Sequence, residues 1–274
     1  MDLTRAVSRL DRGPLTGIDR VELAYLRYLL TRTEQVFALV RTGLGFVLLD
    51  KAGAQGIMDR LIGRAPLGRP DLLGLLTSRQ VPQRLQAEAD ARRLSVARCM
   101  PMRVGAMLRR VLPEGVVYVN VGHADLSARV ARAVKLLPGA RIVVMVHDTI
   151  PLDYPQYCKA DVPGNFARKM TVVSATADLV VHTASCTRVQ TETHFAKAGR
   201  VPCGVTAPLG VDCAPPDAQG LGDLKIPYYV ALGTIEPRKN IGFLLRVWAA
   251  LQKSSDPVPT GRTATSDTSQ TRTL

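Results

Sequence analysis

The sequence predicts an α/β fold with a doubly wound parallel sheet, and three observations support this prediction. First, three continuous β-branched runs are typical of strands buried on both faces of a parallel sheet. Second, helical patterns separate these runs. Third, Tyr229–Trp248 reads as a further strand, a glycine turn, a charged loop and a helix. The third observation indicates that a second α/β domain begins near residue 228.

The elements follow in order along the chain. Val36–Val40 and Phe46–Leu49 are short apolar runs, close enough to form paired strands. The expected strands of the parallel sheet are Val116–Val119, Ile142–Val146, Leu179–Val181 and Val201–Thr206. The expected helices between them are Arg20–Leu30, Met100–Val111, Leu126–Leu137, Phe166–Thr176 and Cys186–Ala196.

Composition changes divide the chain into four parts. We expect an N-terminal domain over residues 1–213, a linker over 214–227, the start of a second domain over 228–252, and a tail over 253–274. Ala214–Asp223 is rich in Pro, Gly and Asp, as linkers often are. Ten of the 21 residues from Ser254 to Leu274 are Ser or Thr, a composition that predicts disorder.

The net charge of +13 predicts an anionic partner, such as a phosphorylated substrate or an acidic membrane surface. Aromatic content is only 5%, and there is no helix-turn-helix pattern, so we do not expect nucleic acid as a partner. The five cysteines are scattered without metal-ligand spacing, and no metal site is expected. Without an apolar leader or an 18-residue apolar run, the expected location is cytoplasmic, with peripheral contact at the inner face of the membrane left open.

The charged loop after the Gly233 turn is a candidate anion site. It carries Glu236, Arg238 and Lys239, and Thr234 follows the glycine. Cations beside the free N–H groups of a helix N-terminus converge on one point, which suits a phosphate. A solvated surface loop is the alternative.

Polar residues also follow two strands of the expected sheet. His147 and Asp148 come directly after the most apolar strand, where open α/β sheets place ligands. The alternative is that Asp148 caps a turn and His147 is a buried imidazole with its hydrogen bonds satisfied. Asn120 and His123 follow the preceding strand, and either line the same crevice or form a strand-end turn.

Gly17 lies in a turn that leads into the first helix. Because glycine has no Cβ, a backbone N–H there can approach a phosphate closely. The alternative is that Gly17 belongs to a plain helix cap.

Together these motifs resemble the retaining glycosyltransferases of family 4, which have the GT-B fold of two Rossmann-like domains. The resemblance extends from about Leu15 to Leu251, and the pairing of an HD-x-x-P motif with GTIEPRKN is its most specific part. The matching segments are Thr16–Val21, Val146–Pro155, His182–Arg188, Ala207–Asp212 and Gly233–Asn240.

The resemblance implies an acceptor-binding N-terminal domain and a donor-binding C-terminal domain. Lys239, with Arg238, matches the residue that contacts the donor diphosphate, and Gly17 matches the turn that approaches the donor phosphates. His147 matches the histidine near the transferred sugar, with Asp148 beside it as a second catalytic candidate. The donor would be a nucleotide sugar used without a cofactor, and a hexose such as mannose would pass to a polysaccharide or lipid-linked acceptor.

The sequence departs from the family in one respect. The family carries a Glu-x7-Glu element in its C-terminal domain, whereas no Glu follows Glu236 in this chain. We therefore expect a C-terminally truncated member that is inactive as an isolated chain, with the Ser/Thr tail as replaced or out-of-frame sequence. The alternatives are a non-catalytic sugar- or phosphate-binding scaffold and, within the same fold, a nucleotide-sugar epimerase or a phosphorylase.

Overall fold

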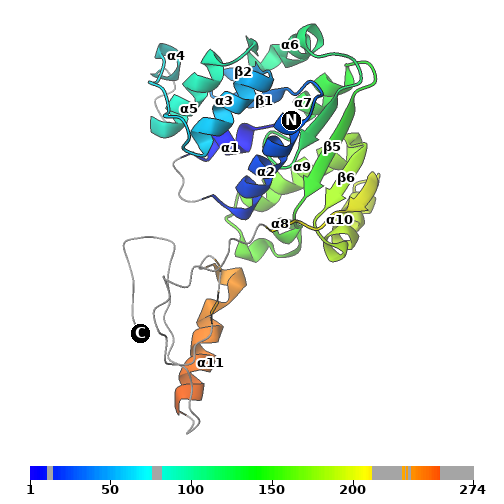
Figure 1. Cartoon of the computed structure of the whole chain (residues 1–274). Helices are drawn as coiled ribbons and strands as arrows, with labels where there is room; N and C mark the ends of the chain where they lie inside the picture. Colours follow the sequence, from blue (N-terminus) through cyan, green and yellow to red (C-terminus); the bar gives the residue numbers. More distant parts are fainter. Residues whose placement is uncertain (11–14, 76–81, 212–229, 232, 234–235, 254–274) are drawn as a thin grey trace. The chain divides into compact units, whose positions relative to one another are not determined.

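The computed structural model describes residues 1–10, 15–75, 82–211, 230–231, 233 and 236–253. The chain divides into two compact units, Met1–Leu209 and Gly210–Leu274, called unit 1 and unit 2 below and described separately (Figure 1). The sequence places the end of the N-terminal domain at residue 213, near this division. The expected linker over 214–227 lies outside the described residues. Unit 1 has the predicted α/β architecture.

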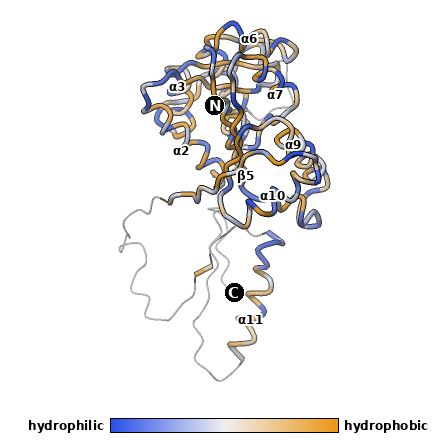
Figure 2. Tube along the Cα trace, turned by 90° about the vertical axis from the view of Figure 1, so that its right-hand side faces the viewer, coloured by the Kyte–Doolittle hydropathy of each residue, from blue (hydrophilic) through white to orange (hydrophobic). Residues whose placement is uncertain are grey.

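A parallel sheet of four strands is the centre of unit 1, with its strands in chain order. The strands are β4 (Val117–Asn120), β5 (Arg141–Val146), β6 (Leu179–His182) and β7 (Cys203–Thr206). Each of the four predicted runs therefore forms a strand, and the trace of β5 is mostly hydrophobic (Figure 2).

A second, antiparallel sheet contains β1 (Ala38–Thr42), β2 (Gly45–Leu49) and β3 (Ala97–Cys99). This sheet confirms the predicted pairing of the first two apolar runs. Gly45 has φ +153°, and a Cβ there would lie 2.1 Å from the Cys99 carbonyl oxygen. The N-terminus connects the sheets, because Asp2 bridges to Leu39 and its N–H donates to the Val119 carbonyl at 2.9 Å.

Ten α-helices lie in the described part of unit 1, and all five predicted helices are among them. They are α1 (Thr4–Ser8), α2 (Gly17–Thr31), α3 (Lys51–Leu61), α4 (Leu72–Leu75), α5 (Pro82–Arg93), α6 (Val104–Val111), α7 (Ala128–Lys135), α8 (Ile150–Asp153), α9 (Val162–Thr176) and α10 (Ser185–Lys197). Short 3-10 turns, Pro101–Arg103 and Pro155–Tyr157, precede α6 and follow α8.

Two hydrophobic cores lie on opposite faces of the antiparallel sheet. Along β1, Leu39 faces a core formed with α6, α7 and α9, whereas Ala38 and Val40 face a core formed with α1, α2, α3 and α5. This alternation follows from the two-residue period of a strand. The first core also takes in Val144 of β5, so it continues under both sheets.

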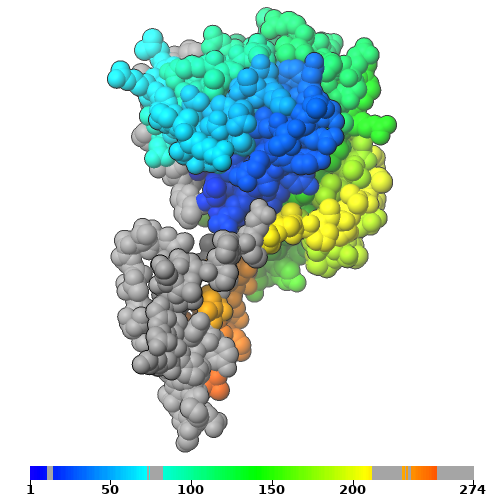
Figure 3. All heavy atoms as spheres, viewed as in Figure 1, coloured from blue at the N-terminus to red at the C-terminus, as the bar shows by residue number. Residues whose placement is uncertain are grey.

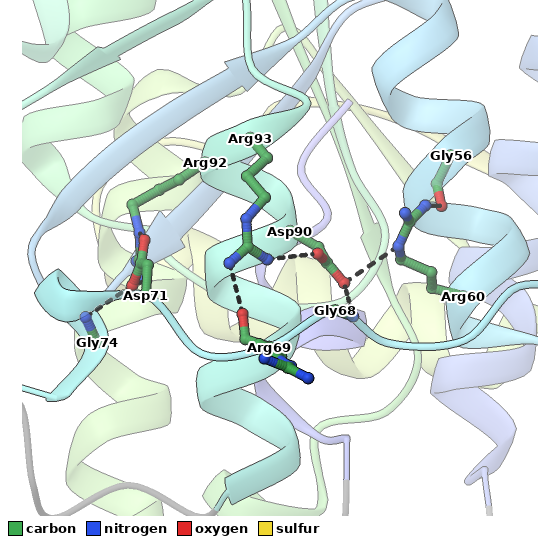
Figure 4. A network of polar contacts seen from close by, with 9 residues as sticks. All are labelled: Gly56, Arg60, Gly68, Arg69, Asp71, Gly74, Asp90, Arg92 and Arg93. Carbon is green, nitrogen blue, oxygen red and sulfur yellow. Dashed lines mark hydrogen bonds and ion pairs between the residues drawn. The ribbon is translucent and has the colours of Figure 1, made fainter.

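An ion-pair network attaches the segment between α3 and α4 to α5 (Figure 4). Asp90 accepts from Arg60 Nε and from the Gly68 N–H, at 3.1 and 2.8 Å. Arg92 binds both carboxylate oxygens of Asp71 at 2.6 Å. Both partners of each pair belong to the scaffold, so we assign this network a structural role.

Unit 2 contains one described α-helix, α11 (Ile241–Lys253), which follows a 3-10 turn over Pro237–Lys239. The helix was predicted. The strand expected just before Gly233 is wrong for Val230 and Ala231, which are not in a strand; Val230 is 78% exposed and pairs with no described strand. Tyr229, Leu232 and the tail over 254–274 lie outside the described residues. Among the described helices, none is long and apolar enough to cross a membrane.

Candidate functional site

The candidate site lies at the carboxyl ends of β4 and β5, where ligands bind in open α/β sheets. Asn120 is the last residue of β4, and His147 follows the last residue of β5. The two strands are parallel neighbours, with Asn120 opposite Val144. The parallel pairing therefore brings together polar residues that are far apart in the sequence.

Two histidines bond reciprocally across the ends of these strands. His123 Nε2 lies 2.7 Å from the carbonyl oxygen of Met145, and His147 Nε2 lies 2.7 Å from that of Val121. The ring centroids are 5.2 Å apart, with 62° between the ring planes. Each imidazole thus fixes the backbone of the neighbouring strand end as well as its own position.

The hydrogen bonds define the protonation of both rings. A carbonyl oxygen can only accept, so each Nε2 carries the proton, and Nδ1 of a neutral ring is an acceptor. Burial lowers the pKa of His123 to about 3, and the neighbouring His147 lowers it further. Burial also lowers the pKa of His147. At neutral pH both rings are uncharged, so they can accept from a hydroxyl but cannot neutralise a phosphate.

Asp148 and Asn120 make local contacts. The Ile150 N–H donates to Asp148 Oδ1 at 3.1 Å, which is the turn contact considered from the sequence. Asn120 is fully buried, and its amide donates to the Ala124 carbonyl at 2.7 Å and to the Tyr118 hydroxyl at 3.2 Å. These contacts shape the loop that carries His123.

That loop, residues 121–127, contains two residues with left-handed backbone that are not glycine. His123 has φ 57° and Asp125 has φ 42°, conformations that cost free energy and concentrate at functional sites. Lys169 Nζ of α9 donates to the His123 carbonyl at 2.6 Å. Burial, and then the charge of Asp2, raise the pKa of Asp125 to about 7. The sequence analysis did not single out Asp125 or Lys169.

A buried carboxyl, Glu22 of α2, lies beneath the same loop. Its side chain is fully buried, and neither Oε atom makes a hydrogen bond with the described residues. A Cβ on Gly122 would lie 3.0 Å from Glu22 Oε1. Burial raises the pKa of Glu22 well above its usual range, the charge of Asp2 contributes to the rise, and the charge of Arg5 opposes it. The sequence signal that could have identified Glu22 as buried is helical spacing, because it lies on one face of α2 with Asp19, Leu23 and Leu26.

Gly17 is the first residue of α2, which begins with a capping box. The Thr16 N–H donates to Asp19 Oδ2 at 2.8 Å, and Arg5 Nε donates to Asp19 Oδ1 at 2.7 Å. A Cβ on Gly17 would meet no described atom within 4 Å. Gly17 therefore begins a regular, capped helix, as the plain-cap interpretation predicts. Its backbone is also open to approach, as the phosphate-turn interpretation requires.

In unit 2, the charged loop forms the start of α11. Arg238 Nε pairs with Glu236 Oε2 at 2.6 Å, and both side chains are exposed. Lys239 is also exposed and makes no ion pair with the described residues. Asn240 has φ 50° and connects the turn to the helix. Thr234 lies outside the described residues. Lys239 is thus the cation here that carries no salt bridge, at the N-terminal end of a helix.

The described residues contain no group of three His, Cys, Asp or Glu placed to hold a metal ion. Comparison of the whole chain with known proteins found no matching family model, no matching curated protein and no matching solved structure.

Proposed function

We propose that this protein binds a nucleotide-diphosphate sugar and transfers its hexose, such as mannose, to a polysaccharide or lipid-linked acceptor, as the retaining glycosyltransferases that it resembles do. The proposal rests on the sequence motifs and above all on the reciprocal histidine pair at the carboxyl ends of β4 and β5. The motif residue His147 lies at the edge of the sheet where an α/β domain binds its ligand.

The protonation of His147 suits contact with a sugar. Its Nε2–H is used by the Val121 carbonyl, which leaves Nδ1 as an acceptor of fixed orientation. A sugar hydroxyl is the donor that such an acceptor recognises. Arg5 lies close enough to lower the pKa of His147 and also donates to Thr16 Oγ1 at 3.3 Å. The Arg5 side chain therefore bonds to the turn before Gly17, and its charge also acts on the histidine.

The diphosphate requires positive charge, which the neutral histidines do not supply. In the proposal the cations of unit 2 supply it: Lys239, assisted by Arg238 and by the N–H groups at the start of α11. Charge that develops on the departing nucleotide diphosphate is stabilised electrostatically by these groups.

A second candidate function is sugar or phosphate binding without transfer. The observation that favours it is that His147 Nε2 and Asp148 Oδ1 are both engaged in local hydrogen bonds. These bonds suit residues that hold a ligand in place better than residues that exchange protons with it.

Isothermal titration with UDP-, GDP- and ADP-sugars, followed by assay of sugar release, separates the candidates. Transfer predicts micromolar affinity for one nucleotide sugar, together with sugar release. Lys239→Ala should weaken binding about 10- to 100-fold, the loss of a charge-assisted hydrogen bond. Lys159→Ala, which removes another exposed lysine, is the matched control. Micromolar binding without release would favour the second candidate, and millimolar or no binding would contradict the proposal.

A further inference from the structure

The positive charge of unit 1 is concentrated in one part of the chain. Residues 98–141 contain eight arginines and lysines but only two acidic residues, Glu114 and Asp125. Residues 148–200, by contrast, hold six lysines and arginines and five acidic residues. Residues 1–209 have a net charge of +12, from 29 Lys/Arg and 17 Asp/Glu, so residues 98–141 supply half of the excess.

That region includes helices α6 and α7, which pack against each other at the outer surface of unit 1 (Figures 1 and 3). Their buried faces are entirely apolar, with Val104 and Leu108 on α6 and Val130 and Val134 on α7. Neither helix contains an acidic residue. We call the exposed surface of these helices and of the preceding turn the arginine face: Met102, Arg103, Arg109, Arg129, Arg132 and Leu136.

The arginines of the arginine face form no salt bridge within the described residues, although the charge of Arg129 acts on the carboxyl of Asp125. Arg132 Nε donates to the Ala128 carbonyl of its own helix at 3.1 Å. Elsewhere in unit 1 arginines are commonly paired, as Arg60 and Arg92 are. The arginine face therefore keeps its charge for an external anion.

Large apolar side chains are exposed among these arginines. Met102 is 82% exposed and Leu136 is 60% exposed. Leu136 lies at the contact between the two helices, because a Cβ on Gly105 of α6 would lie 3.9 Å from Leu136 Cδ1. Flexible apolar side chains surrounded by cations fit an interface that is anionic outside and hydrocarbon within.

We propose that the arginine face docks on an anionic lipid membrane. Nucleic acid is the weaker fit, because single strands are held by stacking on aromatic rings. Tyr118 is the only aromatic residue between Arg98 and Arg141, and it is buried. The docking involves residues separate from the candidate site and does not depend on glycosyl transfer.

Co-sedimentation of the full chain with vesicles tests the proposal. Binding is expected to vesicles of phosphatidylcholine with phosphatidylglycerol, and not to vesicles of phosphatidylcholine alone. Each arginine near an anionic surface contributes about fivefold in affinity, so the variant R103Q/R109Q/R129Q/R132Q should bind at least about 50-fold more weakly. Met102→Asp should weaken binding on its own, and added salt should weaken it for every variant that binds.

The matched control is R27Q/R64Q, which removes exposed arginines outside the arginine face. Because these two arginines lie outside the arginine face, the control should bind the vesicles nearly as well as the wild type and far more tightly than the quadruple variant. Circular dichroism of each variant establishes that the fold is retained. Equal binding by the quadruple variant and the control would overturn the proposal. Tight binding of a fluorescent single-stranded RNA that the quadruple variant alone loses, without vesicle binding by the wild type, would also overturn it.

Discussion

Replacement of Glu22 by Gln provides a direct test of the buried carboxyl beneath loop 121–127. The raised pKa means that the folded protein holds the Glu22 proton at pH values where the unfolded chain, with a pKa near 4.5, has released it. Below pH 4.5 Glu22 is protonated in both the folded and the unfolded protein, so its carboxyl does not lower the unfolding free energy. As pH rises towards the folded-state pKa, the wild type should lose up to about 1.4 kcal/mol of unfolding free energy per pH unit from this group. Glu22→Gln has no proton to release and should not show this loss.

The measurement is urea unfolding of both proteins between pH 4.5 and 7. The packing of Gln at this position changes the unfolding free energy by an amount that does not depend on pH. The carboxyl of the wild type makes the unfolding free energy of Glu22→Gln exceed that of the wild type by an amount that grows with pH. Glu34→Gln is the control, because Arg32 lowers the pKa of the exposed Glu34. Removal of the Glu34 carboxyl should give a small pH-dependent change in unfolding free energy of the opposite sign. A pH-independent difference for Glu22→Gln would show that Glu22 has solvent or a partner and would refute the reasoning.

Three further substitutions test other parts of the fold. Asp19→Ala removes the capping box of α2 and leaves Arg5 without its carboxylate, and should lower the unfolding free energy by about 2 kcal/mol or more; an unchanged urea midpoint would contradict it. His182→Leu removes a fully buried ring whose two nitrogens make no hydrogen bond with the described residues, and it should raise the unfolding free energy by about 1–2 kcal/mol. Burial lowers the pKa of His182, so that gain should increase as pH falls below about 6.5, and calorimetry that shows a loss at low pH would contradict it. Gly122→Ala places a methyl group 3.0 Å from Glu22 Oε1 and should cost about 1–3 kcal/mol, less in a Glu22→Ala background; additive costs in the double variant would show that the two residues do not interact.

The sequence was sufficient to predict the elements whose core contacts are large and apolar. The β-branched runs of β4, β5 and β6 do form strands, but burial alternates along them: one face lies in the first core, and most residues of the other face are only partly buried. Helix α5 was not predicted, since its buried positions carry Ala and ion-paired charges such as Asp90 in place of an apolar stripe. The Val230 strand prediction failed because an apolar run forms a strand only when a neighbouring strand pairs with it.

For the candidate site, the sequence identified the positions but not the contacts. His123 and His147 were found because each follows a strand. Their reciprocal bonds depend on the register of β4 and β5, a tertiary property that strand periodicity does not encode. Asp125 was missed because its left-handed backbone and raised pKa arise only from its surroundings in the folded chain.

The central claim is that this protein binds a nucleotide-diphosphate sugar, and the two residues that the resemblance implicates in binding are His147 of unit 1 and Lys239 of unit 2. Isothermal titration of His147→Ala and Lys239→Ala with a nucleotide sugar and with the corresponding nucleotide diphosphate tests it most directly. We predict that Lys239→Ala weakens both ligands by a similar factor, about 10- to 100-fold, whereas His147→Ala weakens only the nucleotide sugar, by about fivefold. Equal losses for both ligands in His147→Ala, or unchanged affinity in Lys239→Ala, would contradict the claim.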